Sequence, residues 1–288
     1  MRVLVTGGAG LLGRRLAADA PAGVELHRTW RHTPPTDGAG TWHRVDLADR
    51  DATRALVGGL EPDVVVHTAY ATPAGTRDIV AASTHVAEAA STVGAGLVHL
   101  SSDVVFDGEH APYAEGGHAV PISPYGRHKA EAESRVATAC AGAALVRTSL
   151  VTWAEPLDPR SAWVADSLRA GQAITLFTDE VRCPVRLDDL AAQVWEVVGL
   201  EDRGGPWHLA GSEALSRHEL GVLIAEHLGL DPAGITAARS HDQAVPRPRD
   251  LRLTTGRADA ALRTPCRSVR TLFPPSAASG RSITTSSS

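Results

Sequence analysis

The sequence of 288 residues contains no asparagine and only one lysine, Lys129, among its 28 basic residues. Its three cysteines (Cys140, Cys183 and Cys266) follow none of the spacings of a metal or redox site, and a sparse, odd count is typical of a reducing compartment. No apolar run is long enough to span a bilayer, and a net charge of −5 provides no basic surface for nucleic acid. Thirteen histidines form no ligand pattern such as HExxH, so no metal site is predicted. We expect a cytoplasmic protein that binds neither membrane nor nucleic acid.

The near absence of lysine makes the one that is present informative. Arginine stands at every other basic position, as expected for GC-rich coding, so each site that tolerates arginine has had the chance to become arginine. An ammonium is a compact charge with a shiftable pKa, whereas a guanidinium is planar and always charged. We infer that Lys129 occupies a position where arginine fails.

Short, continuously apolar runs alternate with helical patterns through the first half of the chain, as in parallel strands buried on both faces. The sequence therefore predicts an α/β fold with a doubly wound parallel sheet, of the NAD(P)-binding Rossmann type, and a small C-terminal substrate lobe. The dinucleotide-binding domain is expected at 1–150, with later segments returning to it, and the substrate lobe mainly at 151–272. A polar tail at 273–288 has too few apolar residues to order itself. The chain enters its first strand at once, which predicts no signal peptide.

The expected elements can be given by residue range. The predicted strands are Arg2–Thr6, Val24–Thr29, Asp63–Thr68, Gly96–Ser101 and Ala144–Arg147. The predicted helices are Leu11–Ala20, Asp49–Leu60, Asp78–Val93, Ser123–Ala137, Ala162–Ala170, Leu187–Val198, Ser216–Leu228 and Arg257–Leu262. The apolar segment around His208 is expected to be a structural strand of the small lobe.

A glycine-rich loop connects the first strand to the first helix. Its glycines give the spacing GxxGxxG, in which the first permits a tight turn and the second lets the backbone approach a pyrophosphate. The third lets the helix pack closely on the strand, and the helix N-terminus faces the anion. We expect this loop to bind a dinucleotide through Gly7, Gly10, Leu11, Leu12 and Gly13.

The end of the second strand bears on the choice between the two nicotinamide cofactors. It carries no carboxylate for the ribose hydroxyls of NAD, but Arg31, and less directly Arg28, could pair with the 2′-phosphate of NADP. The sequence therefore predicts NADP(H) in preference to NAD(H). Asp46, followed by Leu47, stands where a carboxylate could meet the adenine amino group, although an ordinary capping role is equally open.

Tyr125 and Lys129 stand four residues apart, behind Ser123 as a helix cap and Pro124 at the first helical position. Residues with this spacing share one helix face. A nearby ammonium is expected to lower the pKa of a phenol, which can then exchange a proton with a carbonyl oxygen. Ser102, at the end of the fourth predicted strand, would present a hydroxyl to the same oxygen. These three residues are the candidate catalytic group.

Three segments together resemble a known family. The glycine loop, SSDVVFDG at 101–108 and PISPYGRHK at 121–129 are similar to those of the extended short-chain dehydrogenases/reductases. Within these, the chain most resembles the dTDP-4-dehydrorhamnose reductases over roughly residues 1–265. Those enzymes reduce the 4-keto group of a dTDP-bound deoxysugar with NADPH or NADH. The resemblance therefore implies a nucleotide-sugar substrate.

The resemblance also implies roles for individual residues. Ser102 would polarise the keto oxygen, Tyr125 would protonate it, and Lys129 would bind the nicotinamide ribose. Three residues after the third predicted strand would line the cofactor: His67, Ala69 and Tyr70. The expected substrate contacts are Ser102, Asp103, Val105, Tyr125, Arg182 and Arg249. From its place in the expected small lobe, Arg249 could bind a substrate diphosphate, although an exposed surface charge is equally open.

Two alternatives accompany this prediction. A nucleotide-sugar epimerase or dehydratase uses the same scaffold, but a dehydratase normally has an Asp-Glu pair beside the serine, and here Val104 follows Asp103. The segment 177–184 departs from the reductases and is similar to the regulatory β subunit of methionine adenosyltransferase, which keeps the fold but serves a binding role. A non-catalytic regulatory subunit is therefore the third reading, and a homodimer is compatible with each.

Overall fold

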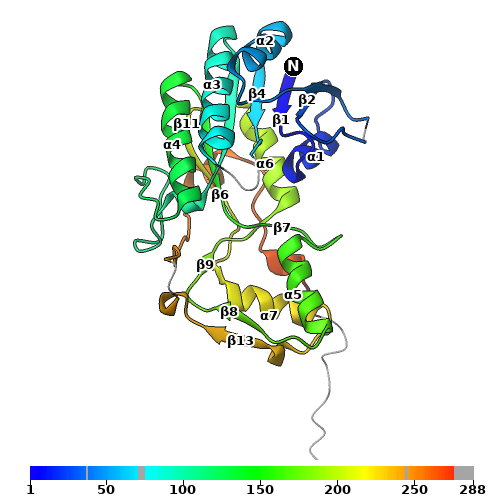
Figure 1. Ribbon diagram of the computed structural model, residues 1–288, viewed down its shortest axis with the longest axis vertical. Coiled ribbons are helices and arrows are strands. Elements are labelled where there is room, and N and C mark those ends of the chain that lie inside the picture. The colour runs from blue at the N-terminus through cyan, green and yellow to red at the C-terminus, as the bar shows by residue number, and fades with distance from the viewer. Residues whose placement is uncertain (37, 71–74, 244–245, 276–288) are drawn as a thin grey trace, which may run out of the picture.

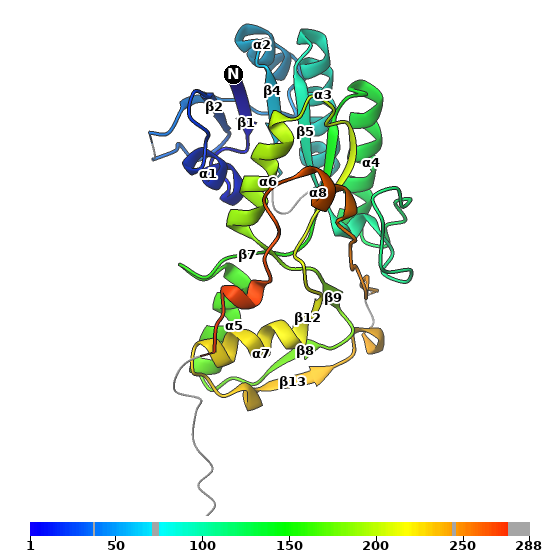
Figure 2. The same ribbon diagram turned by 180° about the vertical axis from the view of Figure 1, so that it is seen from behind.

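The computed structural model describes residues 1–36, 38–70, 75–243 and 246–275. Within these ranges a seven-stranded parallel sheet has the order β11-β6-β5-β4-β1-β2-β3 (Figures 1 and 2). Its strands are β1 (Arg2–Thr6), β2 (Glu25–Trp30), β3 (Thr41–Arg44), β4 (Val64–His67), β5 (Gly96–Ser102), β6 (Ala144–Thr148) and β11 (Gly205–Leu209). The strand order reverses beside β1, where sheets of this type bind ligands at their carboxyl ends. The predicted doubly wound fold is confirmed.

Helices cover both faces of this sheet. On one face lie α2 (Arg50–Leu60), α3 (Ala82–Val93) and α4 (Pro124–Ala139), and on the other lie α1 (Leu11–Ala18) and α6 (Leu187–Gly199), as Figures 1 and 2 show. Alternate side chains of the strands point to opposite faces, so Val3 and Val5 join one apolar layer and Leu4 joins the other. Two apolar layers therefore hold the sheet, and its strand ends are left open for a site.

Three elements of the central sheet and its covering helices differ from the sequence-based expectation, and the short strands of the small lobe were not predicted either. The edge strand β3 was not predicted, because its sequence TWHR is half polar and lacks an apolar run. A π-helical turn at Arg77–Ala81 precedes α3 where a continuous α-helix was expected. The segment around His208 is β11, which pairs with β6 in the central sheet, so its assignment to the small lobe was wrong. Apolar character predicts that a strand is buried, but it does not specify which sheet the strand joins.

A smaller lobe lies below the carboxyl ends of the sheet (Figure 1). In it α5 (Pro159–Arg169) packs against α7 (Arg217–His227), and β8 (Ile174–Phe177) pairs with β13 (Ile235–Ala238). Short strand pairs connect the two parts: β7 (Val151–Thr152) with β10 (Val185–Arg186), and β9 (Val181–Arg182) with β12 (Leu215–Ser216). The short helix α8 (Gly256–Ala261) returns to pack beside β11 (Figure 2).

The C-terminal end of the described chain is anchored in the small lobe. Phe273 was predicted to begin an unstructured tail, but it is fully buried, with its ring edge-on to His227. One aromatic ring is enough to fix the chain here, because it fills space in the apolar cluster of α5 and α7. The rest of the predicted tail from 276 lies outside the described residues. Among the described helices, none combines the length and apolar character needed to cross a membrane.

Candidate active site

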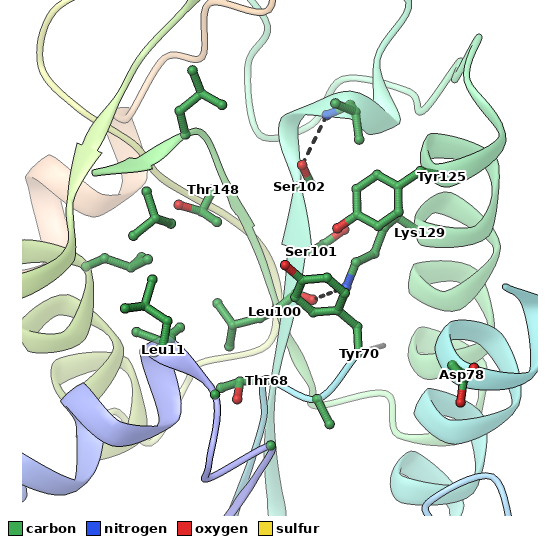
Figure 3. Close-up of a pocket in the computed structure, with 18 of the residues that line it drawn as sticks. Leu11, Thr68, Tyr70, Asp78, Leu100, Ser101, Ser102, Tyr125, Lys129 and Thr148 are labelled. Atoms are coloured by element: carbon green, nitrogen blue, oxygen red, sulfur yellow. Dashed lines mark hydrogen bonds between the residues drawn. The ribbon is translucent and has the colours of Figure 1, made fainter. Parts of the chain in front are cut away.

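A cavity of about 900 Å³ lies between the carboxyl ends of the strands and the small lobe (Figure 3). It brings together most of the residues that the sequence singles out. Its lining includes Gly7, Gly10, Leu11, Leu12, Arg31, Asp46, Leu47, Ala69, Tyr70, Ser102, Asp103, Tyr125, Lys129 and Arg182. Four predicted residues lie outside the lining: Gly13, His67, Val105 and Arg249.

The glycine loop has the geometry that a dinucleotide pyrophosphate requires. Gly7 has φ of +67°, and a Cβ there would lie 2.7 Å from the Cα of Ala69. A Cβ at Gly13 would collide with the carbonyl oxygen of Gly7, so this glycine serves helix packing rather than ligand contact. The N-cap residue of α1, Gly10, supplies no side-chain acceptor, so no cap competes for the N–H groups of the first turn. The loop therefore fits an anion at the helix N-terminus.

Charged residues surround the cavity beyond the end of β2. Arg31 forms an ion pair with Asp78 and lies 3.6 Å from a carboxylate oxygen of Asp46. Arg77 donates a hydrogen bond of 2.6 Å to the same aspartate. Arg31 thus faces the cavity as predicted, but with a carboxylate partner. Asp78 also lines the cavity, and it was not predicted, because the helical turn that follows β4 carries it there.

The second arginine of this strand has a different role. Arg28 is fully buried, and its guanidinium donates hydrogen bonds to the carbonyl oxygens of Gly8 and Ala39. It also stacks over the ring of Trp42 at 3.9 Å. The suggestion that Arg28 could meet a 2′-phosphate is therefore wrong, because its donors are directed into the protein to support the glycine loop.

The candidate catalytic residues converge on one part of the cavity (Figure 3). Ser123 caps α4 and Pro124 opens it, as predicted, so Tyr125 and Lys129 follow on one helix face. The Lys129 ammonium donates a hydrogen bond of 2.9 Å to the carbonyl oxygen of Leu100. The Tyr70 ring lies beside both residues, with its centroid 6.3 Å from that of Tyr125 and 5.6 Å from the Lys129 nitrogen.

Burial sets the proton affinities of this group. It raises the pKa of Tyr125 well above the ordinary value, with smaller contributions from Tyr70 and Asp103. Burial also lowers the pKa of Lys129 to about 8, against an opposing effect of Glu133. The expected lowering of the tyrosine pKa by the ammonium is therefore wrong for this structure, since desolvation of the phenolate dominates. The phenol stays protonated at neutral pH and can act as an acid.

A buried carboxylate stands beside the serine. Asp103 accepts hydrogen bonds from Ser102 at 3.1 Å and from Ser149 at 2.7 Å, and the Arg182 guanidinium lies 4.0 Å away. Burial raises the pKa of Asp103, although Arg182 and Ser149 oppose this effect. Arg182 itself donates to three backbone carbonyls, so it is held in place from several sides. The network fixes the position of the Ser102 hydroxyl at the cavity wall.

Three residues predicted to contact ligands lie away from the cavity. His67 is buried between the hydroxyls of Thr6 and Ser83, and burial lowers its pKa to about 3, so it is a neutral core residue. Val105 is part of an apolar cluster. Arg249 forms an ion pair at the surface. In the described ranges no three His, Cys, Asp or Glu side chains are grouped to hold a metal ion.

Two arginines in the cavity lining were not predicted as ligands. Arg160 and Arg217 lie in the first turns of α5 and α7, and both side chains line the cavity from the small lobe. The capping box that places Arg217 was recognised in the sequence and is confirmed, with Ser216 and Glu219 bonded reciprocally. A cap predicts where a helix begins but not which cavity its first turn faces.

Comparisons with known proteins agree with this geometry. The family model described as RmlD substrate binding domain matches residues 1–277. A dTDP-4-dehydrorhamnose reductase of Mycolicibacterium smegmatis is 30% identical, covering 93% of this chain and 83% of that protein. The methionine adenosyltransferase 2 subunit beta of Mus musculus is 29% identical, covering 80% of this chain and 72% of that protein.

Solved structures share the fold over nearly the whole chain. A hypothetical dTDP-4-dehydrorhamnose reductase from Sulfolobus tokodaii has a TM-score of 0.80 and 26% identity, covering 93% of this chain and 97% of that one. The Bacillus anthracis dTDP-4-dehydrorhamnose reductase in complex with NADP has a TM-score of 0.77 at 20% identity, covering 92% and 95%. The Bordetella bronchiseptica enzyme WbmG in complex with NAD has a TM-score of 0.80 at 21% identity, covering 95% and 92%. With its glycine loop, its Ser-Tyr-Lys group and a family match over 277 residues, the chain belongs to the RmlD substrate binding domain family of extended short-chain dehydrogenase/reductase-like proteins.

Proposed function

We propose that the protein is an NAD(P)H-dependent reductase that acts on the 4-keto group of a nucleotide-linked sugar. Two of its relatives are named dTDP-4-dehydrorhamnose reductase, which is an activity of this kind. The observation that carries this proposal is the convergence of Ser102, Tyr125 and Lys129 on one cavity that also contains the glycine loop. The cavity thus has the groups for cofactor binding at one end and for carbonyl chemistry beside them.

The roles of the chain's own residues follow from their positions. The nicotinamide cofactor, when bound, supplies the hydride. Tyr125 holds a proton that burial keeps on the phenol, and it passes this proton to the keto oxygen. Ser102 donates its hydroxyl hydrogen to Asp103 in this structure and would turn that hydrogen to the keto oxygen when the substrate binds. Within the described residues the Lys129 ammonium donates only to Leu100, and its two other donors bind the nicotinamide ribose.

Consumption of reduced cofactor in the presence of dTDP-4-dehydro-6-deoxy-L-mannose tests the proposal. We expect turnover with this substrate, and none when the substrate is left out. A protein that binds NADPH or NADH tightly but consumes neither with this ketosugar or its UDP counterpart would contradict the proposed reductase activity.

A regulatory role is the second candidate, favoured by the 29% identity to the methionine adenosyltransferase 2 subunit beta. It requires binding to a methionine adenosyltransferase catalytic subunit, which co-sedimentation of the two purified proteins would measure. The complete Ser-Tyr-Lys group in one cavity favours the reductase, because a purely binding role does not need an acid at this position. A dehydratase is disfavoured by the same lining, in which Val104 stands where a dehydratase carries its second acid.

Cofactor binding is expected to weaken as the pH rises through about 8. Burial lowers the pKa of Lys129 to about 8, so above this pH the ammonium that binds the ribose loses its charge. Loss of a charged hydrogen bond raises the dissociation constant of NADPH by about tenfold, measurable by calorimetry across the pH range. The Lys129→Met variant should bind weakly at every pH, and a wild-type constant that does not vary with pH would contradict the role of Lys129.

The same pKa shift has a separate effect on folding. The unfolded chain keeps the Lys129 proton up to the ordinary pKa of 10.5, whereas the folded protein releases it near 8. Between these values the unfolded state binds more protons, so the contribution of Lys129 to the free energy of unfolding increases with pH. Stability and cofactor affinity therefore change in opposite directions, and measuring both separates a loss of binding from a loss of fold.

We propose that NADP(H) is preferred over NAD(H) and that Arg31 and Asp78 set the degree of preference. Arg31→Gln should raise the dissociation constant of NADPH by about tenfold or more and change that of NADH little, because only NADPH has a 2′-phosphate. Asp78→Asn should tighten NADPH binding, because it releases Arg31 from its ion pair. Arg50→Gln is the matched control, since Arg50 pairs with Glu88 on the surface. Equal losses for both cofactors in Arg31→Gln would contradict this assignment.

A further inference from the structure

Arg160 and Arg217 present cationic groups to the cavity without a hydrogen-bonding or ion-pair partner among the described residues. Both line the cavity on its small-lobe side, together with Trp153. Neither guanidinium forms a hydrogen bond or ion pair with any residue in the part of the chain that the structure describes. Arg217 is half-buried, and burial, followed by the charge of Arg160, lowers the pKa of Arg217. A guanidinium held in this way loses hydration that no protein acceptor replaces.

The position of these arginines is unfavourable for stability alone. Each lies in the first turn of its helix, Arg160 in α5 and Arg217 in α7, where the helix dipole disfavours a positive charge. The side chain of Asp158 accepts from the N–H groups of Arg160 and Ser161 in α5, and Ser216 accepts from that of Glu219 in α7, so side-chain caps already occupy both helix starts. The unsatisfied donors here are the guanidinium groups.

Nearby carboxylates offset the positive charge only in part, because Glu180 and Asp158 act to raise the pKa of Arg217 but burial and the charge of Arg160 outweigh them. Arg182, also in the lining, adds a third cation, although its donors are used by backbone carbonyls. Glu180 pairs with Arg247 instead, and Asp158 is occupied as a helix cap. The small-lobe wall of the cavity therefore carries an excess of positive charge, continuous with the space beside Tyr125.

We propose that Arg160 and Arg217 bind the diphosphate of a nucleoside diphosphate sugar and hold its keto group toward Tyr125. Guanidinium groups donate pairs of hydrogen bonds to phosphate oxygens, and two of them match the charge of a diphosphate. This inference rests on the proposed function for the identity of the sugar, whereas the binding of a diphosphate by the two arginines does not depend on it. In this proposal the two arginines take the place of Arg249 as the diphosphate contact, because Arg249 forms an ion pair at the surface.

Binding of thymidine diphosphate and of thymidine to the NADPH-saturated protein, measured by calorimetry, tests the proposal. Arg217→Gln should weaken thymidine diphosphate binding by about 10- to 100-fold, since charged hydrogen bonds are lost. The effect of Arg160→Gln should have the same sign and be smaller, because this side chain is more exposed. Neither substitution should change the affinity for thymidine or for NADPH, and the unchanged NADPH constant shows that the variants are folded.

Arg169→Gln is the matched control, because Arg169 is an exposed arginine at the opposite end of α5. Thymidine diphosphate affinity that is unchanged in both Arg217→Gln and Arg160→Gln would overturn the inference, as would an equal loss for thymidine. The ketosugar assay separates the two proposals. Arginine-dependent diphosphate binding without ketosugar turnover would refute only the reductase, and turnover with no effect of either arginine would refute only the diphosphate site.

Discussion

Replacing Tyr125 by phenylalanine is expected to lower kcat for ketosugar reduction by about 10²- to 10⁴-fold, the usual contribution of a positioned acid. The dissociation constant of NADPH should stay within about twofold, because the ring remains and the lost hydroxyl makes no hydrogen bond within the described residues. The free energy of unfolding should be nearly unchanged for the same reason. Steady-state kinetics and calorimetry on one preparation measure all three quantities.

The neighbouring phenol provides the matched control for this experiment. Tyr70→Phe removes the same atom from a ring whose centroid lies 6.3 Å from that of Tyr125, in the same cavity. Tyr70 is 59% exposed, so its hydroxyl remains hydrated, whereas burial keeps the proton on Tyr125, which also lines the cavity. We expect Tyr70→Phe to retain most activity. A large loss in Tyr70→Phe together with a small one in Tyr125→Phe would assign the acid to Tyr70.

Local patterns in the sequence were sufficient to predict the parts of the site that lie within one element or one turn. The glycine loop and the Tyr125–Lys129 pair are of this kind, because a helix or a strand–loop–helix unit fixes their geometry without reference to the rest of the chain. The inference that Lys129 marks a special position agrees with its buried ammonium, which donates to the Leu100 carbonyl.

Residues brought to the cavity by tertiary packing were not predictable in the same way. Asp78 reaches the Arg31 side of the cavity from a different strand–helix unit, and Arg217 reaches it because α7 packs below the sheet. The opposite error occurred for His67, whose place at the end of β4 suggested cofactor contact although its side chain is buried between Thr6 and Ser83. Strand alternation decides which side chains face a ligand, and a shift of one residue reverses it.

The pKa values of the site residues were the second feature that could not be predicted from the sequence. The i,i+4 spacing correctly placed Tyr125 and Lys129 on one face but led to the wrong sign for the tyrosine pKa. Spacing reports proximity, whereas the pKa depends on how much water remains around the phenolate, which only packing determines. The same packing continues along α4 to Glu133, one further turn from Lys129.

Removing the Glu133 carboxylate is expected to destabilise the protein by about 3–5 kcal/mol, because it leaves the Arg147 guanidinium buried without a counter-charge. The two side chains are only 6% and 7% exposed and approach to 2.8 Å. Arg147 also reaches the carbonyl oxygens of Glu115 and Gly117 and lies over the ring of Phe106, so it cannot move to solvent. Denaturant unfolding of Glu133→Ala measures the loss.

Two further variants separate the buried charge from other effects of the substitution. Glu131→Ala removes a carboxylate from the same helix, but its pair with Arg135 is exposed, so the expected loss is below about 1 kcal/mol. Replacing Glu133 and Arg147 together by methionine should recover most of the stability, because no unpaired charge remains. A Glu133→Ala loss no larger than that of Glu131→Ala would contradict the argument. Since Glu133 also raises the pKa of Lys129, its removal should shift the pH at which NADPH binding weakens to below 8, which ties the packing of α4 to the chemistry of the site.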